Sequence, residues 1–389
     1  MNIPITGLGC ISAAGKNLPE TLQSFKDGLR QAGVVSLFPT NLQYPVFEVK
    51  KFIPEPGKNR MRTMDLALTA TFEAMSMAGY KAGFAGLRVG VCLGTTVASQ
   101  LNDLEFYRTY KQSGEAPMKA IDRYLQGNLS EAVAREVKAN GPCCTVVNAC
   151  SSGTDAIGVA SSWLRAGLCD VVIAGGADEL NMVPYCGFAS LGIVSKNLCA
   201  PFDRDRMGLN LGEGAGILIL ETEQTSRSRG DGQKLSLAGY ASCADAYHLT
   251  APHPEGHGLE NALREAMNEA GITPGEVSFV NAHGTATHDN DLVEGKILSR
   301  FFGPKIKILS TKGYTGHTLG AAGGMEAGFS AAALNEGWIP ASAGFLHQDE
   351  EIPLTPVTET SAIHGQYAVS TSLGFGGSNA VIVLKRKKS

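Results

Sequence analysis

Charged residues are scarce in this chain, and they are not gathered by sign. Asp, Glu, Lys and Arg make up 18% of the 389 residues, where about 25% is usual, and 33 basic residues stand against 37 acidic ones. No nucleic acid is expected as a partner, because phosphate binding needs clustered Lys and Arg. The basic run at residues 385–388 is interpreted as a solvated tail.

The chain also lacks a long uninterrupted apolar segment and any CxxC pair. Its apolar start, residues 1–11, has no basic leader and is broken by Pro4, Gly7 and Gly9, which argues against a signal peptide or a membrane span. The nine cysteines are scattered, so they are expected to be reduced thiols rather than disulfides or zinc ligands. The prediction is a cytoplasmic protein with no membrane association.

What the sequence does have is a regular alternation of short apolar runs with helix-length segments. The runs are too apolar to face water, so they are expected to be strands covered by helices on both faces, in a layered α/β fold. The predicted strands are at residues 88–94, 144–149, 171–175, 277–282, 306–310 and 368–372. The predicted helices are at residues 63–79, 118–138, 152–167, 258–271 and 290–302.

The chain repeats part of itself and is longer than one core usually allows. The echoed segments are 74–79 with 266–271 and, more weakly, 5–9 with 237–241. Two similar α/β halves are therefore predicted. Residues 1–225 would carry the nucleophile turn and a dimer-contact segment, and residues 226–389 would carry two histidine motifs.

The sharpest local signal is TVVNACSSGTDA at residues 145–156, where an apolar strand runs into a turn of small residues and then a helix. Cys150 is expected at a strained elbow just before the helix N-terminus, a position suited to a nucleophile. A helix end favours an adjacent anion by about 0.3–1 kcal/mol, so the pKa of the thiol is expected to fall by roughly one unit from about 8.5.

Two histidines follow apolar strands in the second half. His283 lies in VNAHGTAT at residues 280–287, and His317 ends STKGYTGH at residues 310–317, before a Gly- and Ala-rich helix. Two imidazoles at strand ends can donate N–H groups to one oxygen and so stabilise the enolate left when a carboxylate departs. We expect both rings and the sulfur of Cys150 to converge at the floor of one narrow channel.

These segments, in this order, resemble the β-ketoacyl-acyl carrier protein synthases of the elongating branch with a Cys-His-His triad, within the thiolase-like superfamily. The other matching motifs are TGLG at 6–9, AGGAD at 174–178, PFDRDR at 201–206, GEGAG at 212–216, DAYH at 245–248 and GFGGSN at 374–379. The resemblance implies a thiolase-like fold with α-β-α-β-α layers. It also implies decarboxylative condensation of an acyl thioester with malonyl carrier protein, in fatty acid or polyketide/polyene biosynthesis.

The resemblance also implies roles for individual residues. Cys150 would accept the acyl chain, and its backbone N–H would form the oxyanion hole with that of Phe375, whose ring would gate the acyl tunnel. His283 and His317 would stabilise the enolate oxygen.

Four further positions match supporting residues of that family. Lys312 and Glu326 would together hold the protonation and orientation of His317. Thr285 and Thr287 would hydrogen-bond the pantetheine amides of the carrier protein.

Neither a cofactor nor a metal is predicted. His283, His288, Asp289 and Asp291 have metal-binding side chains, but their spacing matches no zinc signature. The resemblance also implies structural roles for Asp291 and Glu294. No phosphate-binding glycine loop stands in the required context.

An acyl carrier protein is the expected partner, together with a second subunit in a homodimer or in a heterodimer with a chain-length-factor-like protein. Carrier proteins are usually acidic, so docking is expected on a basic patch. The candidates for that patch are Lys58, Arg60, Arg62, Arg204 and Arg206, and Arg206 fits equally well as a structural ion-pair partner. The charged pair Asp122 and Arg123 departs from the family's usual apolar stretch. The pair either lies on a solvated helix face or faces the tunnel or the subunit contact, and in the second case it favours a substrate other than a long saturated chain.

Three alternatives to a self-sufficient condensing enzyme stay open at this point. The chain could be the ketosynthase subunit of a heterodimer, or a cysteine acyltransferase that forms no carbon–carbon bond. It could also be a regulatory subunit that acts through an interface.

Overall fold

The computed structural model describes residues 2–50, 52, 60–96, 104–119, 121–122, 128–230 and 234–387. Ten strands form one array, in the order β3-β2-β4-β5-β1-β6-β12-β11-β7-β8. Those before residue 225 are β1 (Ile3–Ser12), β2 (Val89–Gly94), β3 (Cys143–Val146), β4 (Val171–Asp178) and β5 (Gly214–Glu221). Those after it are β6 (Leu235–Ala244), β7 (Val277–Asn281), β8 (Lys307–Leu309), β11 (Tyr367–Gly374) and β12 (Ser378–Arg386).

The two halves of this array share one topology. The order β3-β2-β4-β5-β1 is repeated by β8-β7-β11-β12-β6, and in both halves the three strands farthest from the junction are parallel while the other pairings are antiparallel. The halves join where β1 pairs with β6. The predicted pair of similar α/β halves is thereby confirmed, while the boundary at residues 225 and 226 stays a prediction.

The sequence echo has a packing reason. Helix α2 (Arg62–Met77) lies on β1, and helix α9 (His257–Ala270) lies on β6. A Cβ atom added to Gly7 would come within 2.1 Å of the Ala74 carbonyl oxygen, and one added to Gly239 would come within 2.1 Å of that of Ala266. The same close helix-on-strand contact therefore requires glycine at the same place in each half.

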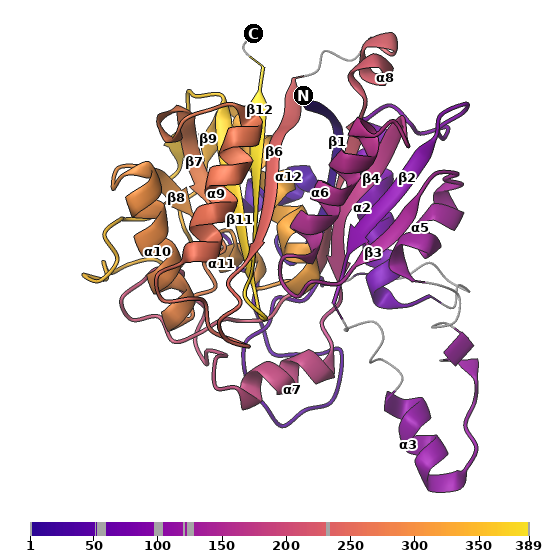
Figure 1. Cartoon of the computed structure of the whole chain (residues 1–389). Helices are drawn as coiled ribbons and strands as arrows, with labels where there is room; N and C mark the ends of the chain where they lie inside the picture. Colours follow the sequence, from indigo (N-terminus) through magenta and orange to yellow (C-terminus); the bar gives the residue numbers. More distant parts are fainter. Residues whose placement is uncertain are drawn as a thin grey trace.

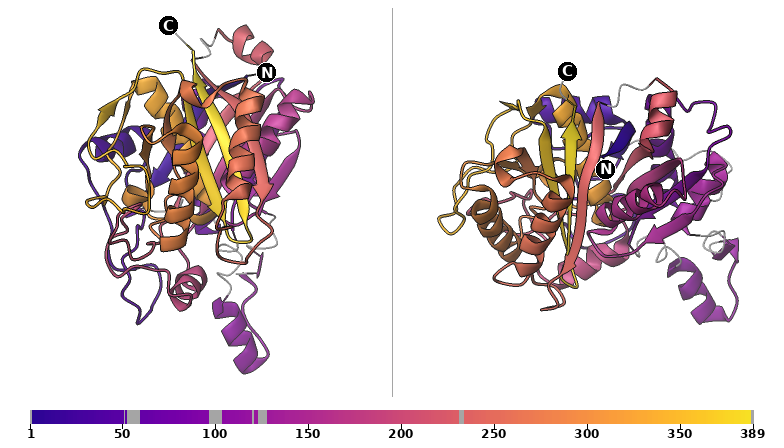
Figure 2. Two further views of the ribbon diagram at one scale, coloured as in Figure 1. Left: turned by 60° about the vertical axis from the view of Figure 1, so that its left-hand side comes forward. Right: turned by 45° about the horizontal axis from the view of Figure 1, so that its top comes forward.

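The helices form three layers around the strands. In the first half α2 and α5 (Leu129–Val137) cover the outer face, and in the second half α9 covers it with α10 (His288–Phe302) beside it. Between the halves lie α6 (Ser152–Arg165) and α12 (Ala322–Glu336), which contact each other and strands of both halves (Figures 1 and 2). This is the predicted α-β-α-β-α layering.

The remaining helices lie outside these layers or near the site. They are α1 (Leu18–Lys26), α3 (Leu104–Ser113), α7 (Met182–Ser190), α8 (Glu223–Ser228) and α11 (Lys312–Thr315). Helix α3 stands away from the body of the molecule, and its Tyr107 and Tyr110 side chains are more than half exposed (Figure 1). Among the described residues, no helix combines the length and apolarity needed to cross a bilayer.

Two secondary-structure predictions were wrong in part. The predicted helix at 118–138 is interrupted rather than continuous. Lys119, Ile121 and Asp122 are helical, but Asn128 has an extended backbone and its side chain accepts a hydrogen bond from the Glu131 N–H, so α5 starts anew at Leu129. The predicted strand at 144–149 ends at Val146. It is an edge strand rather than a central one, although α5 and α6 both contact it, and Val147 just after it is 56% exposed.

Candidate active site

The chain turns sharply between β3 and α6, and Cys150 lies at that turn. Ala149, the residue before it, has a φ of 48°, a left-handed conformation that side chains rarely adopt. Ser151 is the N-cap residue of α6, so Cys150 directly precedes the helix. Its side chain is buried. The predicted strained elbow is therefore present.

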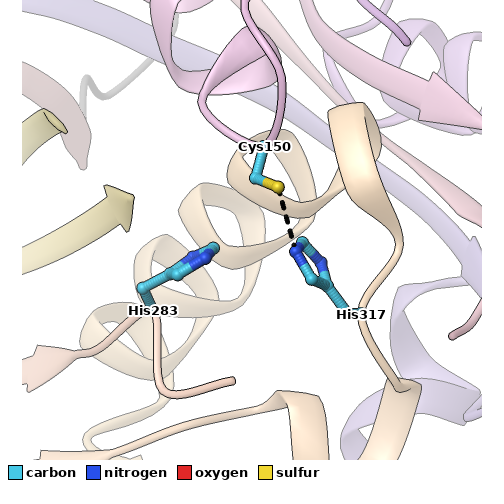
Figure 3. Close-up of side chains that lie close together, drawn as sticks. All are labelled: Cys150, His283 and His317. Atoms are coloured by element: carbon cyan, nitrogen blue, oxygen red, sulfur yellow. Dashed lines mark hydrogen bonds between the residues drawn. The ribbon is translucent and has the colours of Figure 1, made fainter. Parts of the chain in front are cut away.

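The structure brings the three predicted side chains together, from three distant parts of the chain. His317 Nε2 lies 3.1 Å from Cys150 Sγ, and the two imidazole rings stand nearly perpendicular with centroids 5.2 Å apart (Figure 3). One side-chain donor atom from each of the three residues lies within 4.8 Å of the other two. All three are buried.

The hydrogen bonds to the far side of each ring determine which nitrogen carries the proton. The Leu319 N–H donates to His317 Nδ1 at 3.3 Å, and the Lys312 ammonium donates to His283 Nδ1 at 3.2 Å. Since Nδ1 is the acceptor in both rings, Nε2 carries the hydrogen in both. Burial, reinforced by the positive charge of Lys312, lowers the pKa of both imidazoles well below 6.5, so at neutral pH both are uncharged N–H donors.

Lys312 and Glu326 form a buried ion pair behind this site. Burial raises the pKa of Glu326 to about 7 against the opposing effect of the Lys312 charge. The predicted orientation of His317 by this pair is not what the structure shows, although the Lys312 charge does lower the pKa of that imidazole. The ammonium hydrogen-bonds His283 instead, because β8 leads directly into α11 and places Lys312 on the His283 side of the site.

The prediction of a lowered thiol pKa was also wrong. Burial raises the pKa of Cys150 from 9.0 to about 11, although the Lys312 charge and a hydrogen bond from the Phe375 N–H act in the opposite direction. The loss of water around the thiolate therefore outweighs these stabilising groups in the free protein.

Phe375, Thr285 and Thr287 line one cavity, and the gate and pantetheine-binding roles expected of them stay predictions. The cavity has a volume of about 380 Å³, with the Cys150, His283 and His317 side chains among its lining residues. The Phe375 ring stacks on Phe188 at 5.5 Å between centroids, and both rings line this cavity.

The two threonines and the opening of the cavity involve further lining residues. Thr285 Oγ1 and Thr287 Oγ1 lie 2.9 Å apart, and both residues line the cavity. Leu191 and Met207 also line it and are 52% and 70% exposed, so the cavity opens to solvent on their side.

Two buried acids, Asp178 and Glu294, accept hydrogen bonds from backbone N–H groups around the site. Asp178 was not predicted as a site residue. The Asp178 carboxylate accepts hydrogen bonds from the Thr95 hydroxyl, the Thr96 N–H and the Gly320 N–H, next to the turn that holds His317. The sequence feature that could have identified Asp178 is an acidic residue at the end of an otherwise apolar strand, β4. Glu294, interpreted as structural, accepts from the backbone N–H groups of His283 and Gly284.

The remaining acid of the discounted metal cluster also has a structural place. The Asp291 carboxylate is buried and accepts hydrogen bonds from the backbone N–H groups of Phe202 and Ala286. By contrast, His288 and Asp289 are exposed side chains that contact each other.

The predicted basic docking patch was wrong for Arg60 and Arg62, and Arg206 is the structural ion-pair partner of its alternative interpretation. Arg60 pairs with Asp65 and Glu136, Arg62 pairs with Glu213, and Arg206 pairs with Asp349. Their side chains are only 7%, 18% and 1% exposed, because they neutralise acids inside the fold. Arg204 is exposed beside Asp205, and Lys58 and Arg123 lie outside the described residues.

Comparison with known proteins agrees with this architecture. The Beta-ketoacyl synthase N-terminal domain matches residues 53–226, and the Beta-ketoacyl synthase C-terminal domain matches residues 235–346. A curated relative, 3-oxoacyl-[acyl-carrier-protein] synthase 2 of Staphylococcus aureus (strain MRSA252), is 33% identical over 411 residues, which span 99% of this chain and 98% of that protein.

Two solved structures are similar over their whole length. The ishigamide ketosynthase/chain length factor matches with a TM-score of 0.94 and 28% identity, covering 100% of this chain and 99% of that one. A ketosynthase in complex with its chain length factor from Xenorhabdus doucetiae matches with a TM-score of 0.88 and 30% identity, covering 99% and 98%. With both domains of the family matched in order and a relative aligned end to end, this chain belongs to the beta-ketoacyl synthase family of condensing enzymes.

Proposed function

We propose that this protein condenses an acyl thioester with malonyl-acyl carrier protein, with loss of CO₂, in fatty acid or polyketide/polyene biosynthesis. One observation carries the proposal: a sulfur nucleophile and two imidazole N–H donors share the lining of a single cavity that opens to solvent. A hydrolase would need only one of the two histidines.

In the first half-reaction Cys150 Sγ attacks the carbonyl carbon of the acyl thioester. The backbone N–H groups of Cys150 and Phe375 stabilise the tetrahedral oxyanion. Collapse breaks the bond to the carrier's sulfur, which leaves as a thiol after taking up the proton lost by Cys150. The N–H donors from His317 and Phe375 and the charge of Lys312 stabilise the thiolate as it forms.

In the second half-reaction malonyl carrier protein loses CO₂, and the electron pair of the broken bond forms an enolate. Its oxygen accepts hydrogen bonds from Nε2 of His283 and His317, which are both protonated at that atom. The enolate carbon then attacks the acyl carbonyl, forms the carbon–carbon bond and releases the Cys150 thiolate. The thiolate takes up one proton, and the product stays on the carrier as a β-ketoacyl thioester.

The other predicted site residues support these steps without touching the reacting carbons. Thr285 and Thr287 offer hydroxyl groups to the pantetheine arm along the cavity wall. Lys312, paired with Glu326, donates to His283 Nδ1 and so keeps its Nε2 protonated. Neither step transfers a hydride or an electron, so the proposed chemistry uses no redox cofactor.

The test is incubation of the purified protein with acyl carrier protein in its acyl and malonyl forms. A β-ketoacyl product supports condensation. Free fatty acid without such a product would instead assign the protein as a cysteine acyltransferase or hydrolase. A requirement for a second, non-identical subunit would identify it as one member of a heterodimer.

A heterodimer with a chain-length-factor-like subunit is the second candidate. Two similar solved structures are ketosynthases with a chain length factor. The outer strand β3 and the exposed tyrosines of α3 offer an uncovered surface for either a second copy or a related subunit. The mass in solution, measured by light scattering with and without such a subunit, decides between homodimer and heterodimer.

We place the protein in the cytoplasm. All nine cysteines are free thiols, which suits a reducing compartment. Secretion of the native protein, detected by cell fractionation, would contradict this placement.

A further inference from the structure

The strained turn that carries Cys150 is braced by one carboxylate. Asp155, in the first turn of α6, accepts a hydrogen bond from Asn148 Nδ2 at 2.6 Å and one from Ser151 Oγ at 2.8 Å, both at its Oδ2 atom. These two donors flank the Ala149–Cys150 peptide on either side. Asp155 is only 6% exposed, so its carboxylate oxygens depend on these partners rather than on water for hydrogen bonds.

The other oxygen of the same carboxylate is bound by the second half of the molecule. Asp155 Oδ1 accepts a hydrogen bond from the Tyr240 hydroxyl at 2.8 Å, and Tyr240 lies on β6. The tyrosine ring passes directly over Gly158 of α6, where an added Cβ atom would come within 2.2 Å of the ring. Glycine at this position therefore lets Tyr240 reach Asp155.

A second link leads from the brace to the oxyanion side of the site. Ser151 Oγ lies 3.1 Å from Ser378 Oγ, and Ser378 starts β12 just after the turn that contains Phe375. A Cβ atom on Gly374 would lie 3.3 Å from the Cys150 nitrogen. The Cys150 turn and the Phe375 turn are thus held against each other through groups that Asp155 orients.

We infer that Asp155 is a positioning residue, held in turn by Tyr240, which keeps Cys150 Sγ within reach of the N–H donors of His317 and Phe375. A left-handed φ at a residue other than glycine is strained and persists only where surrounding contacts hold it in place. Ala149 has this conformation, with a φ of 48°. Asp155 accepts hydrogen bonds from Asn148 before it and Ser151 after it, so these contacts span the strained residue. The expected effect of Asp155 on the rate of condensation rests on the proposed function. Its effect on the position of the Cys150 thiol does not.

The test measures the thiol directly, without substrate. Asp155→Asn keeps the shape of the side chain but cannot accept from all three donors. The rate of Cys150 alkylation by iodoacetamide is followed from pH 7 to 11 by mass spectrometry of the peptide that holds Cys150, because Cys143 and Cys186 are also exposed to the reagent. We expect alkylation at pH 8 to slow by about tenfold, since the thiolate loses its donors and its apparent pKa rises by about one unit.

Tyr240→Phe removes only the hydroxyl and is expected to slow the alkylation by about threefold, the effect of one lost hydrogen bond. The double variant should be no slower than Asp155→Asn alone, because Tyr240 acts through Asp155. Asp170→Asn and Tyr367→Phe serve as matched controls. These residues lie at the opposite ends of β4 and β11 from the site, so they should react as the native protein does.

Several results would overturn the inference. One is an Asp155→Asn protein that is folded by circular dichroism and is alkylated at the native rate. Another is faster alkylation of that protein, because loss of a nearby negative charge alone would speed the reaction. If Asp155→Asn does not fold, Tyr240→Phe decides alone, and a native rate in that variant overturns the inference.

A last measurement separates positioning from general damage. In a Cys150→Gln background, Asp155→Asn should leave malonyl decarboxylation within about twofold, because the imidazoles are held by other groups. A large loss there would mean that the whole site is distorted and would overturn the inference. A native protein that makes no β-ketoacyl product would end the proposed function but leave the alkylation result standing.

Discussion

At the scale of single residues, the sulfur and the imidazoles have separate chemical tasks. Cys150→Gln should abolish acyl loading while malonyl decarboxylation continues, because both Nε2–H donors stay in place. His317→Ala should lower decarboxylation by about 10²–10³, the usual effect of removing one oxyanion donor, while loading stays measurable. Mass spectrometry of the acyl adduct and release of CO₂ check both. Condensation by the Cys150→Gln protein would contradict the assignment.

The raised thiol pKa gives a pH dependence with a definite sign. Only the thiolate reacts with iodoacetamide, and with the pKa of Cys150 raised from 9.0 to about 11 the thiolate fraction of the folded protein should keep rising through pH 9 and 10. In the unfolded protein the rate should reach half of its maximum near pH 9 and level off above about pH 10. A plateau below pH 8 in the folded protein would show that burial does not dominate.

The buried pair behind His283 can be broken or neutralised. Lys312→Met leaves the Glu326 carboxylate buried without its partner, so the free energy of unfolding should fall by about 3–5 kcal/mol. Adding Glu326→Gln should restore much of that stability. Decarboxylation should stay low in the double variant, because His283 Nδ1 has lost its donor. Recovery of activity together with stability would contradict the positioning role of Lys312.

At the scale of elements, the two central helices depend on glycine where they touch the strands. A Cβ atom on Gly324 of α12 would lie 2.5 Å from the Gly216 carbonyl oxygen and 2.6 Å from the Gly176 nitrogen. Gly324→Ala should therefore lower stability by about 1–3 kcal/mol or more in urea unfolding. On the same helix Gly328 has open space around it, so Gly328→Ala should be neutral or stabilising by up to about 1 kcal/mol. Equal effects of the two changes would argue against this packing.

The element scale also shows how far local pattern reaches. The helices at 152–167, 258–271 and 290–302 appear within a few residues of their predicted bounds, because each apolar face repeats at the helical period. The end of the helical pattern at Asn128 was not predicted, because it depends on a side-chain cap. The edge position of β3 was not predicted either, because it depends on the order of the strands in the sheet.

At the scale of the whole molecule, neither half has a complete core of its own. Helix α12 of the second half packs on β4 and β5 of the first half as well as on β11 and β12. If the chain is cut at residues 231–233, we expect each piece alone to aggregate and the co-expressed pieces to assemble and regain activity. Either piece unfolding cooperatively on its own in calorimetry would contradict this.

The arginines give the same lesson about the whole molecule. In the sequence, the basic residues near positions 60 and 204 are compatible with a docking surface. In the structure, however, Arg62 pairs with Glu213 and Arg206 pairs with Asp349, and each acid lies more than a hundred residues away in the chain. Whether a charged side chain faces a partner or an internal acid depends on long-range contacts that local spacing does not contain.

By itself, the sequence determined the alternation of strands and helices, the two similar halves, the elbow at Cys150 and the family motifs, since each is written in residues close together in the chain. Only the tertiary structure decided that Lys312 serves His283, that burial raises the thiol pKa and that Asp155 is braced by Tyr240. Desolvation and hydrogen bonding depend on what surrounds a group in space, and at this site the surroundings come from both halves of the chain.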